Sequence, residues 1–255
     1  MSVFEQYSQY YDLLYQDKDY AAEARFVLQT IARHAPHARS ILEFGCGTGV
    51  HASLFAASGL TVHGVDLSEE MVAQAQRRRD TLPAGTAQQL TFVSGDIRKY
   101  RAGERFDTVA SLFHVMSYQA SNDDLRAALI TASEHMAEGG IFIFDYWYAP
   151  AVLTQQPTVR VKRMESDRLA VTRIAEPHLN AERSHVEVNY TVFVRDKTND
   201  SIVQLAERHL MRYLTSAEVQ LLADSVGLRI LESCEWMTGK APGADTWGVC
   251  TVLGR

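Results

Sequence analysis

The sequence of 255 residues has no apolar run of 18 residues, the length that a membrane-spanning helix requires. Its first residues, MSVFEQYSQYYD, also lack the basic and then apolar segments of a secretory signal. Proline and glycine, at 6 and 15 residues, form no low-complexity linker between domains. These absences predict a cytoplasmic protein with no membrane partner, built as one large domain or as one domain with an elaborated cap.

Cysteine is scarce as well. Cys46, Cys234 and Cys250 lie far apart, with no C-x-x-C pair and no histidine at zinc-finger spacing. A structural zinc site therefore has little support, and free core thiols are the simplest interpretation. No other dense cluster of metal ligands is present, because Asp123 and Asp124 are better explained as caps of the following helix. We expect no metal.

Basic residues are outnumbered. The chain has 25 lysines and arginines and 31 aspartates and glutamates, which gives a net charge of −6. The longest run of basic residues is 77–79. A nucleic-acid backbone attracts a dense basic surface, so we expect no nucleic-acid partner. The hydrophobic share of 46% is ordinary for a globular domain and is enough to fill a core.

From residue 40 onward, short apolar runs alternate with helical segments. Continuous apolar runs of this length are typical of buried parallel strands, which crossover helices join. The pattern predicts a doubly wound α/β sheet. The expected strands are 40–44, 61–66, 90–96, 106–113 and 140–148, and the expected helices are 19–35, 51–57, 68–79 and 123–136.

The rhythm changes after Pro150, where polar and apolar residues alternate from 158 to 213. Alternation of this kind predicts antiparallel strands with one exposed face. A helix then opens at Thr215 with Glu218 in a capping box, and two strands follow. We expect a seven-stranded Rossmann-like sheet with an antiparallel β insertion as a cap. The expected divisions are a helical flap (1–39), an α/β core (40–150), the cap (151–213) and the completion of the sheet (214–255).

The stretch ILEFGCGTGVH places Gly45, Gly47 and Gly49 directly after the first strand. Glycines here let the backbone approach a ligand closely, because no Cβ intervenes. A phosphate-binding P-loop would continue with Lys-Ser or Lys-Thr, but the chain continues with Val50-His51. The dinucleotide-binding fingerprint requires a small residue at position 50, where this chain has valine. The glycine spacing alone therefore does not identify the ligand.

Three acids close three successive strands: Glu43, Asp66 and Asp96. A carboxylate at Glu43 would repel a pyrophosphate but suits a cation. Asp66, 19 residues after Gly47, is placed to accept both hydroxyls of a ribose, and Asp96 could accept from a purine amino group. Helix capping by the two aspartates, and a solvated strand-end role for Glu43, remain alternatives. Together the acids indicate a cationic adenine nucleoside, and S-adenosyl-L-methionine fits.

The motifs LEFGCGTG, VDLSEEMVAQAQ and GDIRKY resemble those of the class I S-adenosylmethionine-dependent methyltransferases over roughly residues 40–145. The resemblance implies a Rossmann-like methyltransferase fold with that cofactor. It also implies site roles: Gly45 and Gly47 under the methionine part, Glu43 at the loop and ammonium, Asp66 at the ribose, Leu67 and Met71 against adenine, Asp96 and Ile97 at its amine edge, and Phe113 below the pocket.

Three further stretches, YDLLYQDKDYAAEA, SLFHVMSY and DYWYAPAV, resemble the nucleotide-linked amino-sugar N-methyltransferases. Related glycine-type N-methyltransferases share parts of them. This resemblance implies an N-directed reaction on a deoxysugar amine. It also implies that Tyr11 and Tyr20 contact the methionine end of the cofactor, which makes Tyr11 a second catalytic candidate. The cap departs most from the family pattern, so the acceptor itself is not carried over.

His114 is the main candidate for a catalytic base, because it follows the fourth strand at the catalytic edge. A local packing role is the alternative. An amine acceptor needs only a modest proton acceptor, whereas an alcohol needs a stronger base. Aromatic faces near the fifth strand could stabilise a cationic amine, and an arginine could face a substrate diphosphate. The acceptor-site candidates are Tyr118, Tyr146, Trp147, His209 and Arg212.

Several functions stay open from the sequence. The leading hypothesis is methyl transfer to a small-molecule amine, foremost that of a nucleotide-linked amino sugar. An O-methyltransferase that uses His114 as base, an NAD-dependent Rossmann oxidoreductase and a catalytically inactive cofactor-binding protein are the alternatives. The expected partners are a small-molecule substrate and a second copy of the chain, in a homodimer through the β cap.

Overall fold

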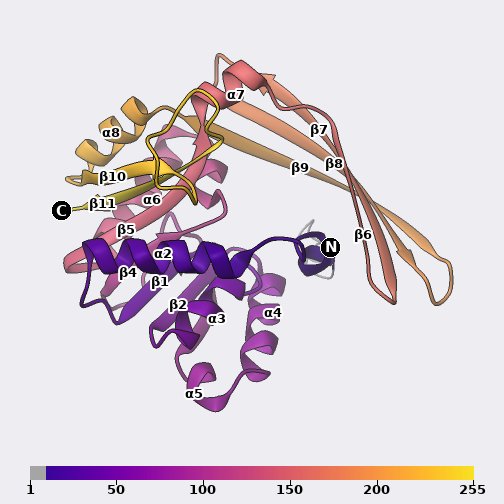
Figure 1. Ribbon diagram of the computed structural model, residues 1–255, viewed down its shortest axis with the longest axis horizontal. Helices are drawn as coiled ribbons and strands as arrows, with labels where there is room; N and C mark the ends of the chain where they lie inside the picture. The colour runs from indigo at the N-terminus through magenta and orange to yellow at the C-terminus, as the bar shows by residue number, and fades with distance from the viewer. Residues whose placement is uncertain (1–9) are drawn as a thin grey trace.

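The computed structural model describes residues 10–255, so residues 1–9 of the expected flap lie outside the described part. Seven strands form a sheet in the order β3-β2-β1-β4-β5-β11-β10, with β11 antiparallel to both neighbours (Figure 1). This confirms the predicted seven-stranded Rossmann-like sheet. The strands are β1 (Ser40–Phe44), β2 (Thr61–Asp66), β3 (Leu90–Ser94), β4 (Phe106–Ser111), β5 (Met136–Tyr148), β10 (Arg229–Glu235) and β11 (Gly248–Gly254).

Helices cover both faces of this sheet. The side chain of Asp19 caps the first of them by accepting from the Ala22 amide at 2.9 Å, and Thr215 with Glu218 forms the predicted capping box on the last. The helices are α2 (Tyr20–His34), α3 (Val50–Ala57), α4 (Glu69–Asp80), α5 (Ala84–Ala87), the short 3-10 helix η1 (Val115–Tyr118), α6 (Asn122–His135), α7 (Ala149–Gln155) and α8 (Ser216–Ser225).

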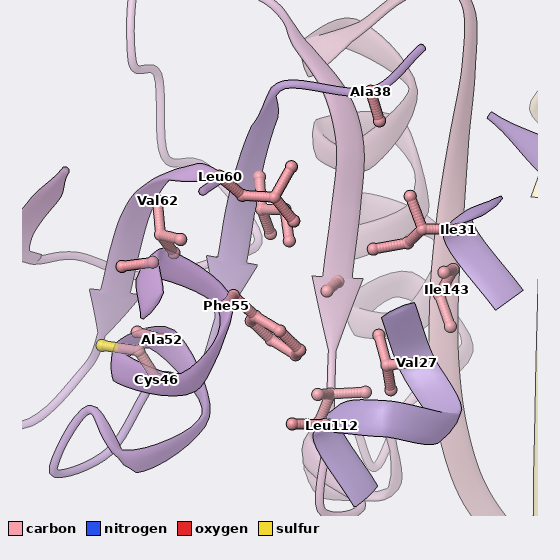
Figure 2. Close-up of a cluster of buried hydrophobic side chains, with 14 of the residues drawn as sticks. Val27, Ile31, Ala38, Cys46, Ala52, Phe55, Leu60, Val62, Leu112 and Ile143 are labelled. Atoms are coloured by element: carbon pink, nitrogen blue, oxygen red, sulfur yellow. The ribbon is translucent and has the colours of Figure 1, made fainter. Parts of the chain in front are cut away.

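Alternation along each strand fills two cores. Ile143 belongs to the buried cluster of Figure 2, together with Val27 of α2 and Phe55 of α3. Ile41 of β1 is a member of the same cluster, which also includes residues of α4. The strand neighbours of Ile41 and Ile143, such as Leu42, point the other way, toward α6 and α8. Burial of each such side chain stabilises the fold by about 1.5–3 kcal/mol. The two cores hold the sheet between its two helix layers. The carboxyl ends of its parallel strands lie along one common edge.

Antiparallel strands form the cap. They are β6 (Arg160–Glu165), β7 (Leu169–Asn180), β8 (His185–Asp196) and β9 (Ile202–Leu214), in the order β6-β7-β8-β9. Only the end of β9 joins the core sheet, where Tyr213 pairs with Trp147 of β5. Figure 1 shows the cap as long hairpins that extend away from the core. Tyr10 and Leu14 pack between α4 and this cap.

Some element boundaries differ from the sequence-based expectation. β4 ends at Ser111 rather than at residue 113, because Phe113 and His114 both adopt positive φ, at 62° and 65°, and leave the strand conformation. The helix α7 was not predicted; Pro150 stands in its first turn, where proline is well tolerated. Among residues 10–255, no helix combines the length and apolar character needed to cross a membrane.

Candidate active site

The glycine loop joins the end of β1 to α3. Gly45, Gly47 and Gly49 have φ values of 68°, 53° and 76°, which favour glycine. A Cβ on Gly45 would collide with Val115 of η1, so this glycine allows close packing of the two segments. A Cβ on Gly47 would meet nothing within 4 Å. The loop therefore presents open backbone at Gly47, as a cradle for a ligand.

Asp66 ties this loop to the end of β2. Its Oδ2 accepts from the Gly47 amide and its Oδ1 from the Ser68 amide, each at 2.9 Å. Burial raises the pKa of this carboxyl above its usual value. The expected ribose acceptor thus stands directly beside the expected methionine cradle, and the structure brings the two together.

Glu43 is a buried acid near the end of β1. The residue is only 2% exposed, and within the described residues Oε2 accepts no hydrogen bond. Burial, with a further contribution from the Asp66 charge, raises the pKa of Glu43 to about 8. A cation placed nearby would stabilise the ionised form. This buried acid fits the cationic end of S-adenosylmethionine.

The N-terminal segment supplies a second cation-stabilising feature. The ammonium of Lys18 lies 4.2 Å from the ring centroids of both Tyr20 and Phe113, and it contacts the Glu23 carboxylate. Tyr11 hydrogen-bonds to Tyr20 through their hydroxyls. Tyr11, Tyr20 and Phe113 therefore meet at one corner of the site, whose aromatic faces favour positive charge.

The expected adenine-binding residues are in different environments. Leu67 is 65% exposed, which leaves an apolar side chain free beside Asp66, whereas Met71 and Ile97 are buried in the core. The Asp96 carboxylate is held by Arg98, whose amide donates to Oδ1 at 3.0 Å, and the Arg98 guanidinium lowers the pKa of that carboxyl. Leu67 is thus available to a ligand, while Asp96 is already engaged by a neighbour.

His114 forms a pair with Asp145. Its Nδ1 lies 2.7 Å from Asp145 Oδ2, and its amide donates to both carboxylate oxygens at 3.1 and 3.2 Å. Asp145, on β5, is 1% exposed, and the His114 side chain is 26% exposed. The carboxylate thus holds the left-handed backbone of His114 through its amide and places a negative charge beside the ring. Because Nδ1 lies beside this carboxylate, Nε2 is the ring nitrogen left to accept a proton from a substrate.

A cavity of about 520 Å³ opens beside this pair, between the core sheet and the cap. Its volume is within the range typical of small-molecule sites. Trp147 and His114 stand together on its core side, with ring centroids 6.2 Å apart. The lining residues are His114, Trp147, Pro157, Thr158, Arg160, Arg173, Ala175, Pro177, Val188, Tyr190, Glu235, Trp236, Trp247 and Gly248.

Tyr118 and His209 lie in a polar network next to the cavity. The Tyr118 hydroxyl is 2.8 Å from His209 Nδ1, and His209 Nε2 is 3.2 Å from Glu207. Tyr10 donates to the other oxygen of Glu207. The Tyr190 ring, 4.9 Å from that of His209, connects this network to the cavity wall. The network ties the N-terminal segment, the cap and η1 together.

Of the five expected acceptor-site residues, Trp147 alone lines the cavity; Tyr118 and His209 lie next to it, and the other two point elsewhere. Tyr146 is fully buried against Phe144 on the opposite face of β5, because side chains alternate along a strand. Arg212 contacts Glu218 at 3.3 Å and lies on the outer face of β9, opposite to His209. Both expectations are corrected: Tyr146 is a core residue, and Arg212 borders the start of α8.

Several site residues escaped the sequence analysis. Asp145 lies within the expected strand 140–148, and its pairing with His114 depends on the neighbouring positions of β4 and β5. Arg173, Trp236 and Trp247 reach the cavity from distant segments. No local sequence motif predicts that these three residues line the cavity. The sequence indicates only that residues near the end of β5 lie close to the ends of its neighbouring strands.

Comparisons with known proteins agree with this geometry. Residues 41–140 match the methyltransferase domain family. The dTDP-3-amino-3,4,6-trideoxy-alpha-D-glucopyranose N,N-dimethyltransferase of Streptomyces venezuelae is 30% identical over 235 residues, which cover 91% of this chain and 92% of that protein. The dTDP-4-amino-2,3,4,6-tetradeoxy-D-glucose N,N-dimethyltransferase of Saccharopolyspora spinosa is 31% identical and covers 76% of this chain and 77% of its own.

Solved structures share the whole fold, including the cap. The crystal structure of Streptomyces venezuelae DesVI superposes with a TM-score of 0.80 at 25% identity, covering 96% of this chain and 97% of that one. The amino pentose methyltransferase CalS10, solved with S-adenosylmethionine, has a TM-score of 0.73 at 23% identity, covering 99% and 96% of the two chains. The glycine cradle, the buried Glu43 and these relatives lead to one conclusion: the chain belongs to the class I S-adenosylmethionine-dependent methyltransferases, in the family of the nucleotide-linked amino-sugar N-methyltransferases.

Proposed function

We propose that this enzyme methylates the amine of a nucleotide-linked amino sugar. The observation that carries the proposal is the position of His114, which follows the cofactor-side residue Phe113 and lines the 520 Å³ cavity. The two N,N-dimethyltransferases compared above are named for dTDP-linked amino sugars, and one of them is 30% identical over 91% of this chain. A base between a cofactor cradle and an acceptor cavity suits methyl transfer.

S-adenosylmethionine supplies an activated methyl group when bound, and the residues of the chain do the rest. The Gly47 backbone, Glu43 and Asp66 would hold the cofactor, with Tyr11 and Tyr20 at its methionine end. Alignment of two bound reactants is worth roughly 7–11 kcal/mol of the barrier. His114 Nε2 would accept the proton that leaves the amine nitrogen as its lone pair forms the new N–C bond. Asp145 would stabilise the resulting imidazolium.

An O-methyltransferase is the second candidate, and the His114–Asp145 pair is the observation that favours it. A buried carboxylate behind a histidine provides the stronger base that an alcohol needs. The two candidates are separated by incubating the enzyme with S-adenosylmethionine and either a dTDP-linked amino sugar or its hydroxyl analogue. We expect one or two methyl groups on nitrogen by mass spectrometry; transfer only to the hydroxyl analogue would overturn the N-methyl proposal.

We further propose a cytoplasmic location and a homodimer. The three cysteines are free, which supports a reducing compartment. On the outer face of the cap, Val161 of β6 and Ile202 and Leu210 of β9 are 48%, 63% and 37% exposed, and exposed apolar side chains on one sheet face support an interface between copies. Sedimentation velocity should give a dimer that Ile202→Glu weakens; a monomer at every concentration would contradict it.

A further inference from the structure

The cavity beside His114 has an aromatic wall and a cationic wall. The core side carries all three tryptophans of the chain, namely Trp147, Trp236 and Trp247. The cap side carries two arginines, Arg160 at the start of β6 and Arg173 on β7. The chain has a net charge of −6, so the positive charge of the cap-side wall is opposite in sign to that of the protein as a whole.

The two arginines differ in their surroundings. Arg173 donates to the Tyr15 hydroxyl at 2.9 Å, and its guanidinium carbon lies 4.7 Å from the Tyr190 ring centroid. Arg160 is exposed at the cavity rim. Within residues 10–255, no carboxylate pairs with it. Arg173 is therefore committed to the aromatic network, whereas the charge of Arg160 is available to a ligand.

Strand register assigns Arg160 to the inner face of the cap. It pairs with Ala175, which also lines the cavity. Arg163, on the same strand, pairs with Thr172 and has the odd position, so its side chain leaves from the opposite face. Arg163 is also exposed and, in the described part of the chain, lacks a carboxylate partner. The two arginines thus form a matched pair, one facing the cavity and one facing away.

The core end of the cavity has the opposite charge. Glu235 lines it, and its carboxylate accepts from the hydroxyls of Thr238 at 2.6 Å and Thr246 at 3.3 Å. His114 with its buried partner Asp145 stands at the same end. An acceptor that is cationic at one end and anionic at the other would fit this polarity, with its amine toward His114 and its anionic group toward Arg160.

We propose that Arg160 binds the diphosphate that joins the amino sugar to its nucleoside, and that this contact selects nucleotide-linked over free amino sugars. The assignment rests on the function proposed above. A guanidinium binds phosphate oxygens through paired, charge-assisted hydrogen bonds, which a point charge or a neutral amide does not reproduce. The contact anchors the acceptor at the rim, so that the sugar lies among the tryptophans with its amine directed to the base.

The binding test needs no cofactor and no turnover. Since every tryptophan lines the cavity, tryptophan fluorescence reports its occupancy directly. Titration with thymidine 5'-diphosphate should give a dissociation constant about tenfold weaker for Arg160→Gln than for the wild type. Arg163→Gln should stay within about twofold, and the difference should shrink at high salt. Thymidine, which lacks phosphate, and inorganic pyrophosphate separate nucleoside binding from diphosphate binding.

Equal affinities of wild type and Arg160→Gln for thymidine 5'-diphosphate would overturn the proposal. So would equal weakening by Arg160→Gln and Arg163→Gln, because that result indicates long-range charge rather than contact. Circular dichroism checks that both variants fold.

A kinetic arm separates this proposal from the proposed function. With a dTDP-linked amino sugar, Arg160→Gln should raise KM by about tenfold with little change in kcat, whereas the methyl glycoside of the same amino sugar should be processed equally by both enzymes. If the wild type methylates no amino sugar, the proposed function fails while the fluorescence result still decides the diphosphate site. If it methylates the nucleotide-linked sugar and Arg160→Gln matches it, only the Arg160 assignment fails.

Discussion

His114 and Asp145 form a single unit: the histidine ring nitrogen Nδ1 lies 2.7 Å from the carboxylate, which also accepts the histidine's own amide proton. The same carboxylate therefore lies beside the ring and restrains, through the amide, a backbone with a φ of 65°. Such a backbone conformation costs of order 1–3 kcal/mol for a residue with a Cβ. The hydrogen bonds from the His114 amide to Asp145 offset part of this cost.

This pairing predicts non-additive kinetics. His114→Asn should reduce turnover by about 10–10² with an amine acceptor, and by up to ~10⁴ with a hydroxyl acceptor, because only the alcohol depends on a strong base. Asp145→Asn should reduce turnover about as much as His114→Asn. The double variant should be no slower than either single variant, because two residues that act as one unit are both inactivated when either is lost. Steady-state kinetics of the three variants checks this. Multiplicative losses would show that the two residues act independently.

Glu43 predicts that cofactor binding releases a proton. Its pKa is raised to about 8 by burial and by Asp66, so the carboxyl is largely neutral at neutral pH. A cation beside it favours the ionised form and lowers that pKa on binding. Cofactor affinity should therefore increase as the pH rises toward 8 and level off above it. Calorimetry near pH 7 in buffers of different ionisation enthalpy should give enthalpies that depend on the buffer.

Glu43→Gln is the control for this effect, because it keeps the shape of the side chain without its titration. Its binding enthalpy should be independent of the buffer. A wild-type enthalpy that is equally independent would remove Glu43 from the cation site.

Asp66→Ala should weaken the affinity for S-adenosylmethionine by about 1.5–3 kcal/mol, through the loss of charge-assisted hydrogen bonds to the ligand. The change also removes the acceptor of the Gly47 and Ser68 amides, so Asp66→Asn, which retains an oxygen, should lose less. Calorimetry with the cofactor and its demethylated product measures both variants. Unchanged affinity in Asp66→Ala would exclude this residue from the ribose site.

The placement of Tyr146 and Trp147 predicts a contrast between neighbours. Trp147→Ala should raise KM for the acceptor, because it removes a wall of the cavity. Tyr146→Phe should leave kcat and both KM values unchanged, since the Tyr146 ring is buried in the core on the other face of β5. Initial rates at varied acceptor concentration compare the two. A raised acceptor KM in Tyr146→Phe would contradict the assignment of this residue to the core.

Local sequence patterns predicted most of the fold. Apolar runs separated by helical segments predicted the seven-stranded sheet, and period-two alternation predicted the cap, because both signals arise from which face of an element is buried. The predicted end of β4 was two residues too late. The leucine and phenylalanine of SLFH continue the apolar run, and no glycine marks the change to positive φ at Phe113.

The residues expected to hold the cofactor, Glu43, Gly47 and Asp66, could be predicted to lie close together, since they belong to one β-α-β unit. The lining of the cavity could not be predicted. Its wall combines Trp147 of β5, Arg173 of β7 and Trp247 before β11, and only the packing of the cap on the core brings them together. Alternation along β5 also decides that Trp147 faces the cavity while Tyr146 does not, and the sequence alone leaves the direction of that alternation unassigned.

The most direct measurement is a crystal structure with the demethylated cofactor and a dTDP-linked amino sugar. We predict that the cofactor lies on the Gly47 cradle with its ribose at Asp66, and that the acceptor amine lies within hydrogen-bond distance of His114 Nε2 and faces the cofactor sulfur. An amine bound away from His114, or a cofactor bound elsewhere than at the carboxyl ends of β1 and β2, would contradict the account.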